Sequence, residues 1–161
     1  MGKINILAKS KKIRVFYSWQ SDLPKTTNLN AIRKAIKKAS DKIESSQMDL
    51  KIIQDEATRD TSGSPHIAST ILDKISKSDI FIADITTITN DVATRACPNP
   101  NVLFELGYAV AQLGWDRIIL LFNQSFGNFP KDIPFDFVQH RISTYSLDEN
   151  EDVDKKTYST I

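Results

Sequence analysis

One carboxylate in this chain stands in a setting that could serve chemistry. Glu105 lies within the run Asn101-Val-Leu-Phe-Glu-Leu-Gly-Tyr-Ala109, whose other side chains are mostly apolar. An acid in such a segment can stabilise a helix N-terminus or pair with an arginine. It can also bond to ribose hydroxyls and stabilise the positive charge that develops while a glycosidic bond breaks. The spacing alone leaves both interpretations open.

Other polar side chains follow three short apolar stretches of the sequence. They are Ser18, Trp19, Gln20, Ser21 and Asp22 after the first stretch, Arg59, Asp60 and His66 after the second, and Asp84, Thr86, Asn99 and Asn101 after the third. Each has a structural and a functional interpretation. Trp19 covers a sheet edge or stacks on a base, and Arg59 is a solvated charge or a phosphate contact. Asp84 caps a turn or touches ligand, and the same two roles are open to Asn101. For His66 we expect neither a metal nor a general-base role, since it has no cysteine or acid partner in the sequence.

Strands and helices are expected to alternate along the chain and to position these groups. The strands are expected at 13–18, 50–54, 79–85 and 117–122, with a weaker edge strand near 141–145, and the helices at 28–44, from Pro65 to about 78 with Ser64 as cap, and at 101–113 with Gly114 closing it. The third helix is apolar around most of its circumference, which predicts that it is largely buried. Strict alternation predicts an α/β fold with a doubly wound, flavodoxin-like, five-stranded parallel sheet. Such sheets bind ligands outside the carboxyl ends of their strands, where the polar groups fall.

The amino-acid composition limits the number of domains and the classes of partner that we expect. The chain has 161 residues, of which 40% are hydrophobic, enough for one domain with a core. Its 21 basic and 20 acidic side chains give no field that favours a nucleic acid or membrane partner. The single cysteine, Cys97, cannot form an internal disulfide, and no stretch approaches the roughly 20 apolar residues that span a bilayer, so we expect a cytoplasmic protein. We expect an extension over 1–11, one domain over 12–146, and over 147–161 a linker or the start of a further helix, which would lead to another domain in a longer protein.

Four segments resemble TIR-like (Toll/interleukin-1 receptor) domains of the bacterial anti-phage effector, predicted nucleotide-binding type. They are Arg14–Asp22, Asp55–Ile67, Asp79–Asp84 and Pro98–Ala109. The most specific is the Asn-Val-Leu-Phe-Glu-Leu-Gly block, because related effectors carry their catalytic glutamate in a very similar setting. The resemblance therefore implies that Glu105 is catalytic. It also implies substrate contacts from the loop after the first strand (Ser18, Trp19, Gln20), with Arg59, Asp84 and Asn101 as further candidates. One departure is visible, since many TIR enzymes carry a tryptophan where this chain has Asn101.

The resemblance also implies an activity and partners. The activity is that of an NAD+ glycohydrolase, which releases nicotinamide and gives ADP-ribose or a cyclic isomer without a metal or an organic cofactor. The segment from Glu56 to His66 corresponds to the loop that gates TIR enzymes and contacts a neighbouring subunit. The implied partners are NAD+ or a related nucleotide, further copies bound through TIR surfaces, and a fused or separate sensor. No nucleic acid or membrane partner is expected.

Two other functions stay open at this point. A nucleoside 2-deoxyribosyltransferase-like enzyme has the same sheet order and uses a glutamate as a covalent nucleophile. Its usual Gly-Thr stretch before the glutamate is replaced here by Pro98-Asn-Pro-Asn101. A non-catalytic module that binds a nucleotide or another TIR surface is the third hypothesis.

Overall fold

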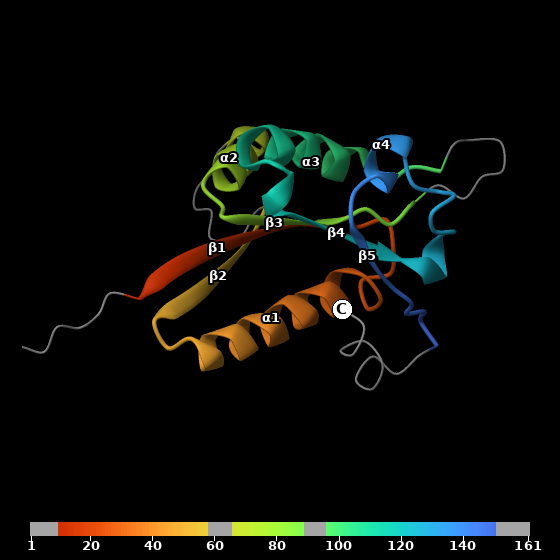
Figure 1. The fold of residues 1–161 in the computed structure, drawn as a ribbon. Helices are drawn as coiled ribbons and strands as arrows, with labels where there is room; N and C mark the ends of the chain where they lie inside the picture. The colour runs from red at the N-terminus through yellow and green to blue at the C-terminus, as the bar shows by residue number, and fades with distance from the viewer. Residues whose placement is uncertain (1–9, 58–65, 89–95, 151–161) are drawn as a thin grey trace, which may run out of the picture.

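The computed structural model describes residues 10–57, 66–88 and 96–150, which form a five-stranded sheet with helices on both faces (Figure 1). All strand pairs are parallel, in the order β2-β1-β3-β4-β5. The strands are β1 (Lys11–Ser18), β2 (Leu50–Glu56), β3 (Ile80–Asp84), β4 (Ile118–Asn123) and β5 (Ile142–Tyr145). The helices are α1 (Leu29–Ser46), α2 (Ile67–Ser76), α3 (Pro100–Leu113) and the single turn α4 (Phe135–Val138). The predicted flavodoxin-like α/β class is confirmed. The expected extension and tail fall largely outside the described residues, so those boundaries stay a prediction.

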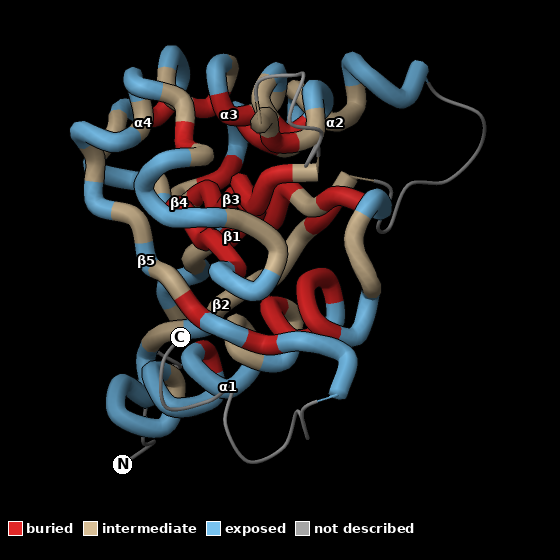
Figure 2. Tube along the Cα trace, turned by 90° about the vertical axis from the view of Figure 1, so that its right-hand side faces the viewer, coloured by how far each residue is buried: buried red, intermediate tan, exposed pale blue. Residues whose placement is uncertain are grey.

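Two layers of helices enclose the sheet. Helix α1 covers one face, and α2, α3 and α4 lie against the other (Figure 1). Because successive side chains of a strand point to opposite faces, β1 contributes to both cores. Phe16 packs in the cluster under α2 and α3, whereas Val15 and Tyr17 pack in the cluster over α1. Figure 2 shows the buried residues concentrated along the strands and the exposed ones on the outer sides of the helices.

The ends of two helices test the capping predictions. Helix α2 begins at Ile67, and its N-cap is His66, whose Nδ1 accepts from the backbone N of Ser69 at 3.4 Å. The predicted cap, Ser64, is therefore wrong, and it lies outside the described residues. His66 takes the role because its backbone is extended, it directly precedes the first helical residue, and its ring nitrogen can accept from that first turn. Helix α3 ends at Gly114, as predicted, where a φ of 77° favours glycine.

Helix α3 is less buried than its apolar sequence predicts. Its buried residues are Val102, Leu106, Ala109 and Leu113, which form one stripe against the sheet. Phe104 points away from that stripe and is 62% exposed. The prediction of a largely buried helix is wrong because one face of α3 is left open to solvent. None of the helices within the described ranges is both long and apolar enough to cross a bilayer.

Candidate functional site

A pocket of about 440 Å³ opens at the carboxyl end of β1, between the first turns of α2 and α3. Its walls come from four places along the chain. The lining residues are Tyr17, Ser18, Trp19, Gln20 and Ser21 from β1 and its loop, Ala57 after β2, Ile67, Ala68, Ile71 and Leu72 from α2, and Asn99, Asn101, Phe104 and Glu105 from α3 and its cap. This is the edge of the sheet at which open parallel folds bind ligands.

Glu105 and Ser18 meet at the base of this pocket. Ser18 follows Phe16 by two positions, so its side chain points to the same face of the sheet, toward α3. The Ser18 hydroxyl donates to Glu105 Oε2 at 2.5 Å, and Ser18 itself is only 1% exposed. Burial raises the pKa of Glu105, and the hydrogen bond from Ser18 opposes that rise because it favours the charged form. The site thus holds a partly desolvated carboxylate in a fixed position.

The two structural interpretations of Glu105 fit this geometry poorly. Glu105 lies in the second turn of α3, beyond the first turn within which the helix dipole acts. The partner that the structure gives it is a serine and not an arginine. Among the described residues Glu105 has no cationic partner. A half-buried carboxylate in that situation costs stability, and such groups are concentrated at functional sites.

Gln20 fixes the loops around the pocket. It is 3% exposed, its Nε2 donates to the carbonyl of Thr86 at 2.8 Å, and its Oε1 accepts from the backbone N of Asn99 at 3.3 Å. Asn99 in turn caps α3 by accepting from the backbone N of Asn101, and it donates to Asp22 at 2.6 Å. The Gln20 amide is therefore engaged by the protein, where the sequence suggested substrate contact. Its role in this arrangement is to hold the beginning of α3, and with it Glu105, against β1.

Trp19 lies at the boundary between the pocket and the α1 face of the sheet. Its ring packs against the core cluster over α1, and the guanidinium of Arg33 lies 5.7 Å from the ring centroid. Arg33 also donates from Nε to Glu56 at 2.8 Å and forms a second bond to the same carboxylate through Nη2. Trp19 thus contributes an edge to the pocket, while much of its surface covers the sheet.

Asp84 lies below the pocket and does not line it. It is fully buried, and its carboxylate accepts from the backbone N of Thr86 at 3.0 Å, the Thr86 hydroxyl at 2.6 Å and Asn28 Nδ2 at 3.0 Å. Burial raises the pKa of Asp84, and these three bonds oppose the rise. Asn123, also buried, joins the same network through Asn28 and Thr86. These contacts support the turn-capping interpretation of Asp84 over ligand contact.

Five of the seven site residues that the sequence suggested meet at the pocket. They are Ser18, Trp19, Gln20, Asn101 and Glu105. Arg59 lies outside the described residues. The sequence did not single out Phe104 or Ile67, which line the pocket and are 62% and 61% exposed. A helical projection could have found Phe104, since it lies off the stripe formed by Val102, Leu106 and Ala109.

Among the described residues, one side chain gives the pocket its charge. Glu105 is the only charged side chain among the described residues that line it. Within the same described ranges, no group of three or more histidine, cysteine, aspartate or glutamate side chains is arranged to hold a metal ion.

The fold and pocket define a class: a flavodoxin-like α/β domain with a half-buried carboxylate at the carboxyl end of its first strand. Residues 26–134 match the model of the CAP12/Pycsar effector protein TIR domain. The chain belongs to this family of effector TIR domains, which confirms the TIR-like resemblance. A search of curated proteins found no match.

Two solved structures are similar to this chain at low sequence identity. One is a 2-desoxiribosyltransferase from Leishmania mexicana, with 16% identity, a TM-score of 0.41, and coverage of 69% of this chain and 65% of that one, just under two thirds of its length. The other is the CMP N-glycosidase BcmB from Clostridium botulinum, with 16% identity, a TM-score of 0.39, and coverage of 83% of this chain and 90% of that one.

Proposed function

We propose that this domain is an NAD+ glycohydrolase that breaks the bond between nicotinamide and ribose, with Glu105 as its catalytic residue. The observation that carries the proposal is the Glu105 carboxylate, half-buried in the pocket and held by Ser18. Membership in the effector TIR family supports the same role, because the family block that contains the glutamate is present here.

The charge of the pocket favours NAD+ over a neutral nucleoside. The nicotinamide of NAD+ carries a positive charge, and a carboxylate attracts it. When the C–N bond breaks, the bonding pair neutralises the ring nitrogen, so nicotinamide leaves without needing a proton. A neutral base such as cytosine leaves as an anion unless an acid protonates it. A site whose single charged described residue is one carboxylate is suited to the first reaction.

The reaction follows from this arrangement. The bond from ribose C1′ to nicotinamide breaks, the electron pair goes to nicotinamide, and an oxocarbenium-like cation forms at C1′. Glu105, as the carboxylate, stabilises that cation and bonds to ribose hydroxyls. Water then attacks C1′ and loses a proton, which gives ADP-ribose, whereas attack by a nucleophile within the same molecule gives a cyclic isomer. We expect the reaction to need no metal or organic cofactor.

The direct test is base release from parallel substrates. The protein at high concentration is incubated separately with NAD+, with CMP and with deoxynucleosides, and the products are identified by mass. We expect nicotinamide and ADP-ribose or its isomer from NAD+, and no base from the others. Release of cytosine, or transfer between deoxynucleosides, would favour the transferase-like alternative. An intact nucleotide that stays bound even to the assembled protein would favour a binding module.

The pH dependence of activity reports the protonation state of Glu105. Because the carboxylate is the active form, activity falls as the pH drops through its pKa, which burial raises. Ser18→Ala removes a hydrogen bond that favours the charged form, so the acid limb of kcat/KM shifts to higher pH. Ser45→Ala, an exposed serine on α1, is the matched control and leaves the limb unchanged. A limb that stays in place, or activity that rises toward acid pH, would mean that Glu105 does not act as a carboxylate.

The biological setting is part of the same proposal. We propose a cytoplasmic antiviral effector that acts by consuming NAD+ and whose site is completed by self-association. The activating signal would come from a fused or separate sensor. Rate measurements over a range of protein concentrations test this, because an assembled site gives activity that rises faster than in proportion to concentration.

A further inference from the structure

We propose that Phe104 and Ile67 form a wall of the pocket on its α2–α3 side. The planar base that the enzyme releases, nicotinamide in the case of NAD+, stacks against this wall. This inference rests on the proposed function, because it names the part of the substrate that each side of the same pocket holds. It assigns a role in base recognition to two residues that the sequence analysis did not single out.

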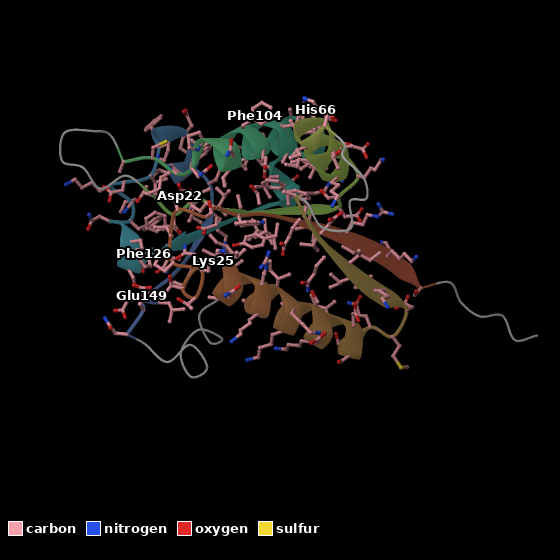
Figure 3. All side chains as sticks on the ribbon, turned by 180° about the vertical axis from the view of Figure 1, so that it is seen from behind. Asp22, Lys25, His66, Phe104, Phe126 and Glu149 are labelled. Carbon is pink, nitrogen blue, oxygen red and sulfur yellow. The ribbon has the colours of Figure 1, made fainter. Side chains whose placement is uncertain are left out.

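The exposure of these two side chains is the first observation. Phe104 is 62% exposed and Ile67 is 61% exposed, and both line the pocket beside Glu105. Figure 3 shows Phe104 on α3 and His66 at the start of α2 on the same side of the sheet. Ile67 follows His66 directly, so both exposed groups belong to facing helix starts. Ile71 and Leu72 continue the same wall toward the core. Apolar groups that gather at the rim of a cleft and stay open to solvent are typical of a binding surface.

The second observation concerns the other two aromatic residues of the pocket. Tyr17 is buried in the core cluster over α1 and is only 2% exposed. Trp19 also lines the pocket, but its ring packs against the core cluster over α1. The guanidinium carbon of Arg33 lies 5.7 Å from the centroid of that ring. A cationic ring next to that guanidinium gains less than one that stacks on a free aromatic face. Phe104 belongs to neither of the two core clusters found among the described residues. Its face is therefore the aromatic surface in the pocket that is best suited to a base.

The third observation is the order of groups along α3. Asn101, Phe104 and Glu105 all line the pocket within little more than one helical turn. A substrate whose ribose lies at Glu105 can place its base toward Phe104 and a polar substituent of that base toward the amide of Asn101. The ligand class that fits is an N-glycoside of a flat heteroaromatic ring that carries an amide or amino group.

The test separates the base from the rest of the substrate. Binding is measured by calorimetry in the Glu105→Gln background, with NAD+ and with ADP-ribose, which keeps the adenine and lacks the nicotinamide. We expect Phe104→Ala to weaken NAD+ about tenfold, as expected for loss of one stacking contact, and to leave ADP-ribose unchanged. Phe104→Tyr keeps a flat ring and retains NAD+ affinity. Phe135→Ala removes another exposed phenylalanine, 70% exposed on α4 and outside the pocket, and affects neither ligand.

The outcomes of this experiment test the stacking role of Phe104 independently of whether the protein cleaves NAD+. Equal weakening of NAD+ and ADP-ribose, or no weakening of either, would overturn it even if the wild type releases nicotinamide. The same measurement with CMP and ribose 5-phosphate covers a protein that does not cleave NAD+. If Phe104→Ala weakens the binding of CMP and not that of ribose 5-phosphate, the stacking role of Phe104 is supported even though the proposed NAD+ activity is wrong. If neither pair shows a base-dependent loss and Phe104→Ala instead lowers the oligomeric mass in sedimentation, the patch is a contact between copies and the inference is wrong.

Discussion

Glu105→Gln will strongly reduce the release of nicotinamide and keep the fold. The amide has the size of the carboxylate and can still accept from Ser18, but it cannot offer a negative charge to the developing cation. Loss of such an electrostatic contact lowers kcat by about 10²–10³-fold. Because burial raises the pKa of Glu105, the folded state disfavours the charged form, and the contribution of this residue to stability improves as the pH falls through that pKa. Replacing it with a neutral amide should therefore keep or slightly raise the Tm at neutral pH.

The measurement is nicotinamide release together with a thermal melt. Glu149→Gln is the matched control, since it makes the same chemical change at an exposed position after β5, and it should retain full activity. Equal turnover by Glu105→Gln and the wild type would end the catalytic assignment. A loss of activity accompanied by a large fall in Tm would instead return Glu105 to a structural role.

Asp84→Ala will destabilise the domain by about 3 kcal/mol, the scale of a lost buried hydrogen-bonded charge. The substitution leaves the backbone N and hydroxyl of Thr86, and the amide of Asn28, without their acceptor in a fully buried position. For a chain of this length, about 3 kcal/mol corresponds to a fall in Tm of roughly 6–12 °C. Asp84→Asn, which keeps acceptor capacity on one oxygen, should lose less.

The control and the functional readout distinguish this role from ligand contact. Asp136→Ala, at an exposed position on α4, should leave the Tm within about 1 °C, because surface substitutions change stability little. At a temperature where Asp84→Asn is fully folded, its KM for NAD+ should equal that of the wild type. An increase in KM without a change in Tm would show that Asp84 touches substrate after all.

Local patterns in the sequence were sufficient for most of the fold. The β-branched and apolar runs gave the five strands, and the three- and four-residue apolar spacing gave the three long helices, since both periods follow from backbone geometry. Their ends were less well predicted. The caps depend on single side chains, and at α2 the nearest suitable one, His66, is not a typical capping residue. The short α4 was missed because one turn carries no periodic signal.

The candidate site was predicted in outline by position at strand ends and by the family block around Glu105. The sequence did not predict which of these side chains face the pocket. Gln20 and Asn99 are 79 positions apart in the sequence, and Ser18 and Glu105 are 87 apart, so no local pattern could show that they bond. In the sequence, Asp84 could not be distinguished from the other polar residues that follow the strands. In the structure its carboxylate bonds to Asn28 and Thr86 and does not line the pocket.

The sequence by itself determined the order of strands and helices, the parallel sheet and the block that carries Glu105, because these depend on periodicity and on contiguous residues. Only the tertiary structure decided that Ser18 holds the carboxylate, that Gln20 and Asp84 serve the protein, and that Phe104 stays exposed at the rim of the pocket. The physical reason is that hydrogen bonding and burial are fixed by which distant segments pack together.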